Sequence, residues 1–265
     1  MISKILFIPR AAADILKVLL HKKISFAERC NIAKALGKIK LAGLTKKLND
    51  PFIFFLGSLK INCLYNKHIG FLVKEIFLEK VYEVKNNVEV KTILDFGSNI
   101  GLSLVYFKLR FPFAAIEAYE PDKESFKLLQ KNISQNNFNN ISAYEMAVSN
   151  KLGFLFAADV VEKASVNSQF VGDGKDENSK VVAKDIEDIL NKNFDIVKMD
   201  IEGGEWNLFR KIVDENLITK ANHWFVEFHE VEKNKKQFGE ILNCFEKNGY
   251  EREGIKGVVY FYKNI

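Results

Sequence analysis

From residue 90 onward, short apolar runs alternate with longer stretches that are apolar on one side only. The short runs have the length of buried strands, and the longer stretches have the spacing of amphipathic helices. This alternation predicts an α/β fold with a mostly parallel sheet and helices on both faces. The expected strands are residues 92–96, 115–120, 141–148, 194–199 and 224–228, and the expected helices are residues 101–110, 122–136, 206–216 and 233–248.

Smaller elements are expected around this core, because turn residues separate further periodic segments. We expect strands at 52–56 and 59–64 around a turn at Gly57 and Ser58, a helix at 71–82, an extra strand at 152–157, a polar loop at 160–179, a short helix at 184–190, and a closing hairpin of 250–253 and 258–262 through Gly254 and Gly257.

The first 48 residues predict a separate helical extension, followed by one domain over residues 49–265. A first helix is expected at residues 11–21. Ser25 and Glu28 have the S-x-x-E spacing of a capping box, which starts a second helix. Gly37 is a candidate for its end.

Charge distinguishes the two parts. The whole chain has a net charge of +5, but residues 1–48 hold eleven basic and two acidic residues, a net +9. The other 28 basic and 32 acidic residues leave the larger part at −4. A mildly acidic main domain argues against a nucleic-acid partner.

Composition points to a reducing compartment. Three scattered cysteines, Cys30, Cys63 and Cys244, form neither a disulfide framework nor a metal motif. Charged residues interrupt the first twenty positions, so a signal peptide or a membrane span is not expected there. We expect a cytoplasmic protein. A basic, amphipathic arm could contact a membrane peripherally, or pack on the main domain or on a second subunit as a homodimer.

The segment 92–101, TILDFGSNIG, has the pattern of a buried strand, a tight turn and a helix start. Gly97 and Gly101 allow the backbone to approach a ligand closely. Their G-x-x-x-G spacing differs from the G-x-G-x-x-G of dinucleotide sites. It suits S-adenosylmethionine, which has no pyrophosphate. Ser98 and Asn99 would then lie at its amino-acid end, with Asp95 near the ammonium group.

Two further positions extend this candidate cofactor site. Glu120 ends the second expected strand, where a carboxylate can accept hydrogen bonds from both ribose hydroxyls. Met146 and Ala147 would end the third strand and face the adenine ring, although both residue types are also common in plain cores.

These residues resemble the FkbM family of S-adenosylmethionine-dependent methyltransferases over about residues 52–229. The resemblance implies a class I, Rossmann-like fold with seven strands and one antiparallel edge, and O-methylation of hydroxyls on sugars or natural products. Ser98 replaces the family's usual alanine, and residues 1–48 lie outside the match. The matching segments are LDFGSNIG at 94–101, YEP at 119–121, AVS at 147–149, KMDIEGGE at 198–205 with the family's K-x-D-x-E-G-x-E pattern, and the lead-in containing Glu75, Phe77 and Tyr82.

Candidate catalytic residues follow the fourth and fifth expected strands, which end at the same sheet edge. Residues two apart in an extended chain point the same way, so Asp200 can share a face with Glu202, and Glu227 with His229. A hydroxyl is a poor acid and needs a base or a metal. His229 is the expected base, oriented by Glu227 or Glu202. Asp200, Glu202 and Glu227 could instead hold Mg²⁺.

Simpler interpretations stay open for these residues. Asp200 could cap the following helix, His229 could be an ordinary strand end, and Lys198 and Glu205 fit structural roles. His21, His68 and His223 have no motif around them and are expected in the core or on the surface.

Three functions remain in view. The expected one is O-methylation of a small molecule or glycan with a free hydroxyl. An N-methyltransferase acting on protein or nucleic acid is disfavoured, because such enzymes often carry a proline-rich element where this chain reads DIEG at 200–203. A non-catalytic protein that binds S-adenosylmethionine is the third.

Overall fold

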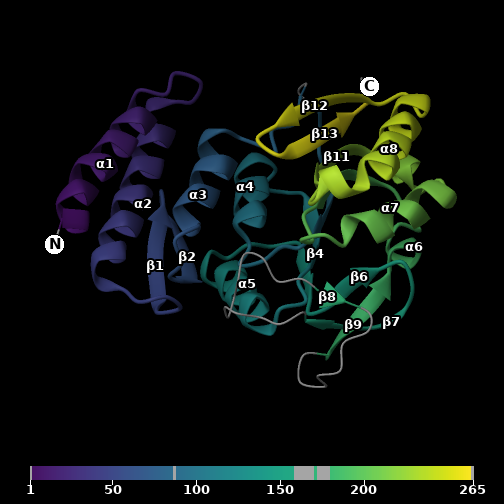
Figure 1. The fold of residues 1–265 in the computed structure, drawn as a ribbon, viewed down its shortest axis with the longest axis horizontal. Coiled ribbons are helices and arrows are strands. Elements are labelled where there is room, and N and C mark those ends of the chain that lie inside the picture. The colour runs from purple at the N-terminus through teal and green to yellow at the C-terminus, as the bar shows by residue number, and fades with distance from the viewer. Residues whose placement is uncertain (1, 86–87, 158–169, 172–179, 264–265) are drawn as a thin grey trace.

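The computed structural model describes residues 2–85, 88–157, 170–171 and 180–263. Its centre is a seven-stranded sheet with the order β12-β13-β11-β10-β3-β4-β5 (Figure 1). The parallel pairing of the five strands from β11 to β5 confirms the predicted α/β architecture. The strands are β3 (Thr92–Phe96), β4 (Ala115–Tyr119), β5 (Ile141–Tyr144), β10 (Phe194–Met199), β11 (Ala221–Glu227), β12 (Glu251–Ile255) and β13 (Val258–Tyr262).

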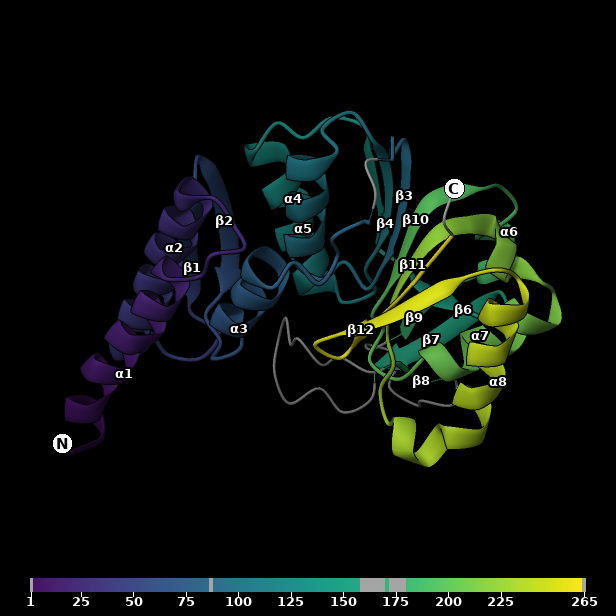
Figure 2. The same cartoon turned by 90° about the horizontal axis from the view of Figure 1, so that it is seen from above.

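Helices cover both faces of this sheet, as Figure 2 shows edge-on. Successive strand residues belong to different cores: Ile93 and Ile196 pack on one side, Leu94 and Val197 on the other. This alternation follows from the period of two in a strand, and burial of both faces explains the continuous apolar runs. One face carries α4 (Leu102–Arg110) and α5 (Lys123–Gln135), and the other carries α6 (Ile186–Ile189), α7 (Glu205–Asp214) and α8 (Lys235–Lys247). Two 3₁₀ turns, η3 (Leu217–Lys220) and η4 (Val231–Asn234), flank β11.

The predicted closing hairpin is confirmed. β13 is antiparallel to both β11 and β12, so the antiparallel strand lies one place inside the edge of the sheet. Lys256 and Gly257 make the turn, both with positive φ. Gly254 lies within β12 instead of in the turn.

The predicted third strand, residues 141–148, is wrong as a single element. β5 ends at Tyr144, and β6 (Ala147–Ser149) pairs with β9 (Lys180–Asp185) in a separate four-stranded sheet. The apolar pattern continues across this break, so periodicity alone could not reveal it. The second sheet also contains the predicted extra strand β7 (Gly153–Ala157) and β8 (Phe170–Val171).

The second sheet changes two other expectations. The helix expected at 184–190 begins only after β9, where the Asp185 side chain caps α6 by accepting from the Glu187 amide. The loop expected at 160–179 lies mostly outside the described residues, and its described part, 170–171, forms β8.

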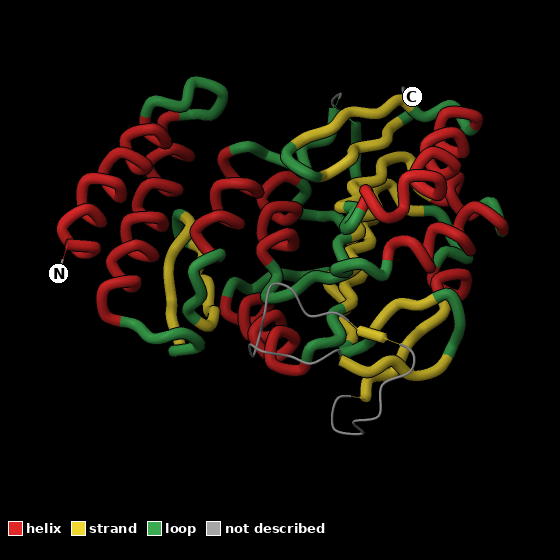
Figure 3. The backbone as a smooth tube through the Cα atoms, viewed as in Figure 1, coloured by secondary structure: helices red, strands yellow, loops and turns green. Residues whose placement is uncertain are grey.

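The N-terminal part contains α1 (Ile2–Leu19), α2 (Phe26–Thr45), the hairpin of β1 (Pro51–Leu56) and β2 (Leu59–Leu64), α3 (Ile69–Val73) and a π-helical turn, η1 (Lys74–Leu78) (Figure 3). The Ser25–Glu28 capping box is confirmed. The predicted stop at Gly37 is wrong, because α2 continues for eight residues beyond it. Gly37 faces Ile15 of α1, and such packing outweighs the roughly 1 kcal/mol cost of a helical glycine.

The N-terminal helices share a core with the rest of the chain. Val18, Ile32 and Leu36 are almost fully buried, and they belong to the same apolar cluster as Phe54 and Phe107 of the following domain. This packing is the arrangement expected of a helical cap. Within the described residues, no helix combines the length and apolarity needed to span a membrane.

Candidate active site

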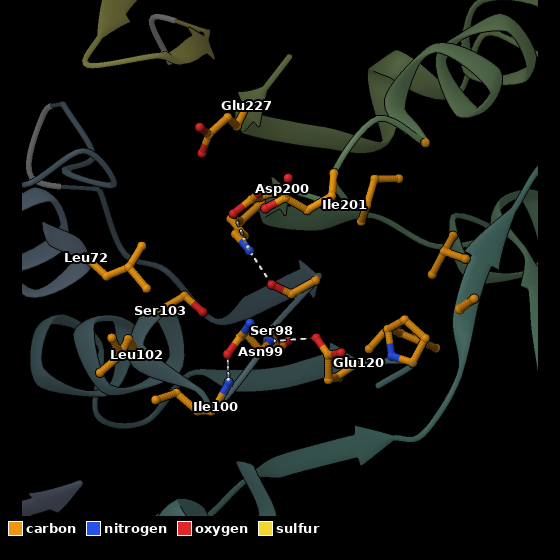
Figure 4. A pocket seen from close by; sticks show the side chains of 18 of the residues that line it. Leu72, Ser98, Asn99, Ile100, Leu102, Ser103, Glu120, Asp200, Ile201 and Glu227 are labelled. Carbon is orange, nitrogen blue, oxygen red and sulfur yellow. Dashed lines mark hydrogen bonds and ion pairs between the residues drawn. The ribbon is translucent and has the colours of Figure 1, made fainter. Parts of the chain in front are cut away.

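A cleft opens at the carboxyl ends of β3, β4, β10 and β11 (Figure 4). It encloses about 1060 Å³ including its open mouth. Its lining comes from the glycine turn (97–100, 102 and 103), the end of β4 (119–121), the β5–β6 connection (146–148), Leu155, the end of β10 (198, 200–202, 204), Glu227, and the N-terminal segment with Leu72, Glu75, Ile76 and Tyr82.

The two glycines of the turn are required, though not for the predicted reason. Both have positive φ, +72° at Gly97 and +89° at Gly101. A Cβ on Gly97 would lie 1.7 Å from the Asp200 carbonyl oxygen, and one on Gly101 would lie 2.7 Å from Leu129 Cδ1. The protein's own packing therefore excludes side chains at both positions. Gly97, Ser98 and Asn99 line the cleft, while Gly101 does not.

Asp95 does not reach the cleft, which corrects its predicted contact with the cofactor. Its side chain is fully buried, 3.2 Å from Lys198 Nζ, and it accepts a 2.6 Å hydrogen bond from Ser103. Lys198 also donates to the Gly97 carbonyl at 2.6 Å. Burial lowers the pKa of Lys198, but the charges of Asp95 and Asp200 outweigh this and leave it raised. The pair anchors the glycine turn to β10, which agrees with the structural role expected of Lys198.

Glu120 lies at the predicted position, buried at the cleft wall. Its carboxylate oxygens accept hydrogen bonds from the amides of Asn99 (2.7 Å) and Asp122 (2.8 Å). Burial raises the pKa of Glu120 to about 7, against the opposing effect of these two amides. Each carboxylate oxygen can accept a second hydrogen bond, so Glu120 is fixed in place and still able to bind hydroxyls.

Met146 and Ala147 both line the cleft. They lie on the connection between β5 and β6, and the expectation that they end a strand is wrong. Tyr119 stacks on Tyr144 beside them, with ring centroids 4.9 Å apart. This side of the cleft is apolar and suits a flat ring.

Three further carboxylates, Glu75, Asp200 and Glu227, line the cleft, and Figure 4 shows Glu227 and Asp200 across from Glu120. Burial raises the pKa of all three, and the charge of Asp200 adds to the shifts at Glu75 and Glu227. The pKa of Glu75 reaches about 7. Carboxyls of this kind accept protons more readily than exposed ones near neutral pH.

The predicted pairing of Asp200 with Glu202 by strand geometry is wrong, although both line the cleft. β10 ends at Met199, and Glu202 lies in a turn with φ +56°. Among the described lining residues, Glu227 is present and His229 is not. β11 stops at Glu227, so the extended backbone that would align Glu227 with His229 does not continue to His229.

The His229 imidazole contacts two carboxylates, Glu202 and Glu205. Its predicted role paired it with Glu227 or Glu202 instead. Its Nε2 lies 3.2 Å from Glu202, and its Nδ1 lies 3.2 Å from Glu205. Burial lowers the pKa of His229, but these contacts outweigh it and raise the pKa to about 11. A histidine that holds its proton is a poor base, and His229 is not among the described lining residues of the cleft, so the structure does not favour it as the general base.

Glu205 organises the turn before α7, as its expected structural role requires. It is fully buried and accepts hydrogen bonds from the amides of Ile201 (3.0 Å) and Gly203 (2.9 Å). Asp200 does not cap this helix, since the cap position is Gly204 without a side-chain bond.

The structure does not gather the predicted metal ligands Asp200, Glu202 and Glu227. Within the described residues, the possible ligand atoms that lie within 4.8 Å of one another belong to Asp200, Glu205 and His229. Two of these three are already committed: Glu205 to backbone amides and His229 to two carboxylates.

Glu75 and Tyr82 were not among the predicted site residues. Both come from the segment before the sheet, more than 100 residues from Asp200 along the chain. The signal that could have identified them was their place in the lead-in that resembles the FkbM family.

His223, which had no predicted role, lies in the core. It is buried and contacts the Tyr260 hydroxyl at 2.9 Å, away from the cleft.

Known proteins resemble this chain in sequence and in fold. The profile described as "Methyltransferase FkbM domain" matches residues 95–252, more than half of the chain. Methyltransferase 1 of Beauveria bassiana (strain ARSEF 2860) is 26% identical over 194 residues, which span 64% of this chain and 76% of that protein.

Two further matches are more partial. Methyltransferase sdnD of Sordaria araneosa is 30% identical over 108 residues, 40% of this chain and 42% of that protein. The crystal structure of Methyltransferase FkbM from Methylobacillus flagellatus KT aligns with a TM-score of 0.48 and 14% identity, over 96% of this chain and 59% of that one. The extent of the profile match decides the assignment: this chain belongs to the FkbM family of methyltransferases.

Proposed function

We propose that this methyltransferase uses S-adenosylmethionine to methylate a hydroxyl group of a sugar, glycan or natural product. The observation that carries the proposal is the polarity of the cleft. A carboxylate suited to a ribose lies on one side, and carboxylates of raised pKa lie on the other. A hydroxyl loses its proton on methylation, so a buried proton acceptor beside the cofactor is the group that this reaction needs.

The described residues fit the cofactor. Glu120 has free acceptor capacity for the ribose hydroxyls, and Met146 and Ala147 offer an apolar wall for the adenine. Ser98 and Asn99 lie at the glycine turn, where the amino-acid end would bind, and Asp200 is the nearby cleft carboxylate for its ammonium group. S-adenosylmethionine supplies a methyl group that its positive sulfur already activates.

Glu227 is the residue that we assign as the general base. It lines the cleft, and no side-chain hydrogen bond or ion pair engages its carboxylate in the described structure. Burial first, and then the charges of Asp200 and Glu75, raise its pKa. It can therefore take the proton of the acceptor hydroxyl while the cleft walls hold that oxygen in line with the methyl group. His229 becomes a positioning residue that fixes Glu202.

Mg²⁺ does not fit the residues that come together here. Both nitrogens of His229 already contact carboxylates, and Glu205 accepts hydrogen bonds from two backbone amides. We expect EDTA to leave turnover unchanged. Activity that EDTA abolishes and Mg²⁺ restores would overturn this assignment.

Turnover tests the proposal directly. The purified protein is incubated with S-adenosylmethionine and a panel of hydroxyl and amine acceptors, and both S-adenosylhomocysteine and methylated product are quantified. We expect methoxy products, and Glu227→Gln should lower kcat by roughly 10²–10⁴ while cofactor affinity is retained. Methylamine products would support an N-methyltransferase. Cofactor binding without turnover of any acceptor would support a non-catalytic protein.

A further inference from the structure

Tyr82 places a hydroxyl at the cleft. The residue is 6% exposed and lines the cleft next to Glu75. Its ring is fixed by contacts with Tyr106, Phe107 and Phe225. No hydrogen bond engages its hydroxyl among the residues that the structure describes, and the charges of Asp200, Glu227 and Glu75 act on it. The hydroxyl is therefore available to a ligand atom in the cleft, as donor or as acceptor.

Glu75 presents a second unengaged group at the same wall. It belongs to the π-helical turn η1, a geometry often found at functional sites. Its carboxylate lines the cleft without a side-chain hydrogen bond or ion pair in the described part of the chain, as does that of Glu227. Tyr82 offers a donor, and Glu75 and Glu227 offer acceptors.

The charge of the cleft restricts what can bind there. Five described lining residues are acidic, and Lys198 is the lining cation. Lys198 is 2% exposed and committed to Asp95 and to the carbonyls of Phe96 and Gly97, so it cannot compensate an anionic ligand. A carboxylate or phosphate on the acceptor would meet uncompensated repulsion in a partly dry site.

An uncharged hydroxyl can use both kinds of group at this wall. A hydroxyl donates one hydrogen bond and accepts others, so it can donate to Glu75 and accept from Tyr82. Glu75 and Glu227 both line the cleft and influence each other's charge, so they offer acceptors to neighbouring hydroxyls of one ligand.

We infer that Tyr82 and Glu75 form the acceptor subsite, and that they select neutral polyols with adjacent hydroxyls and reject anionic ones. This inference rests on the proposed O-methylation. In the bound state, one acceptor hydroxyl pairs with Tyr82 and Glu75, and its neighbour faces Glu227. Glu75 and Tyr82 are thus specificity-determining residues, whereas Glu227 takes the proton.

Binding of matched glycosides tests the inference without requiring turnover. The probes are the methyl glycosides of glucose, galactose and mannose and the corresponding uronates, which differ only by a carboxylate at C6. Dissociation constants are measured by NMR at pH 8 with the enzyme saturated by S-adenosylhomocysteine. We expect at least one neutral glycoside to bind at least 10-fold more tightly than its uronate.

Variants assign the effect to the two residues. Tyr82→Phe should weaken the neutral glycoside about 3–10-fold, the usual effect of one lost hydrogen bond. Glu75→Gln should bring the uronate closer to the neutral glycoside in affinity. Tyr106→Phe, which removes a buried hydroxyl outside the cleft, and Glu79→Gln, an exposed neighbour of η1, should change neither value.

Three results would overturn the inference: equal binding of a uronate and its neutral partner, an unchanged ratio in Glu75→Gln, or no binding of any glycoside. Unfolding temperature and affinity for S-adenosylhomocysteine establish that each variant is folded. The proposed function is judged separately, since Glu227-dependent methylation of another hydroxyl acceptor would stand even if the glycosides failed to bind.

Discussion

At the scale of single residues, Glu120 joins the two halves of the cofactor site. Its oxygens hold the amides of Asn99 and Asp122, and the remaining lone pairs face the cleft. We expect Glu120→Ala to weaken binding of S-adenosylmethionine by about 1.5–3 kcal/mol, because hydrogen bonds to a charged group are lost. Calorimetry measures the change. Glu124→Ala, in the first turn of α5 and not among the described lining residues of the cleft, is the control, and equal losses in both variants would refute the role of Glu120.

His229 makes a prediction about stability and pH. Its pKa is raised from 6.5 to about 11 in the folded protein, so its ion pairs contribute fully below pH 6.5 and are lost as pH rises through 11. His229→Gln should therefore lower the free energy of unfolding by about 1.5–3 kcal/mol at pH 6, and by less at pH 10.

Urea unfolding at the two pH values measures this difference. A difference from wild type that grows with pH would contradict the imidazolium assignment. A fall in kcat as large as that of Glu227→Gln, without loss of stability, would return the role of base to His229.

At the scale of elements, the backbone at the end of β10 packs closely against the glycine turn. Because a Cβ on Gly97 would lie 1.7 Å from the Asp200 carbonyl and φ is +72°, Gly97→Ala must move one of the two segments. We expect it to cost more than about 2 kcal/mol of stability and to abolish cofactor binding.

A glycine in an open environment is the matched control. Gly239 lies in α8, and a Cβ there would meet nothing within 4 Å. Gly239→Ala should stabilise the protein by about 0.5–1 kcal/mol through helix propensity. Thermal unfolding compares the two variants, and similar effects at both positions would show that the crowding at Gly97 is not decisive.

At the scale of the whole molecule, α1 and α2 belong to the same core as the sheet domain. Leu36 is 1% exposed and shares this core with Phe54 and Phe107. Leu36→Ala should destabilise the protein by about 2–5 kcal/mol, because it leaves a cavity in a packed interior. Unfolding should remain a single transition by fluorescence and circular dichroism. Two separate transitions would mean that the N-terminal part unfolds independently.

The same helices also present apolar side chains to solvent. Leu16, Leu20 and Phe26 are 55%, 65% and 67% exposed, near the exposed Lys22 and Lys23. We propose that this end of the helix pair contacts an anionic membrane surface, where each lysine adds about 1 kcal/mol. The protein should pellet with phosphatidylglycerol vesicles at low salt and be released at high salt.

Substitutions locate this contact on the molecule. Leu20→Glu with Phe26→Glu should abolish pelleting, and Phe113→Glu, on an 89% exposed side chain after α4, should not. Truncation is a poorer test, because removing α1 and α2 would expose the core beneath them. Wild-type protein that stays in the supernatant at low salt would eliminate the membrane contact.

The sequence by itself determined the order of the main strands and helices, the glycine turn, the capping box and the position of Glu120. These features depend on local periodicity and on residue types that act within a few positions. The acidic positions Asp200, Glu202 and Glu227 were also predicted to meet at the cleft, because parallel strands end at a common edge.

Only the tertiary structure decided what these groups contact. Glu75 and Tyr82 reach the cleft from a distant segment, Asp95 is paired with Lys198 away from it, and His229 is held as a cation. The break between β5 and β6 depends on pairing with β9, far along the chain. Burial and charge pairing set the protonation of these groups, and both arise from contacts between segments that no local pattern specifies.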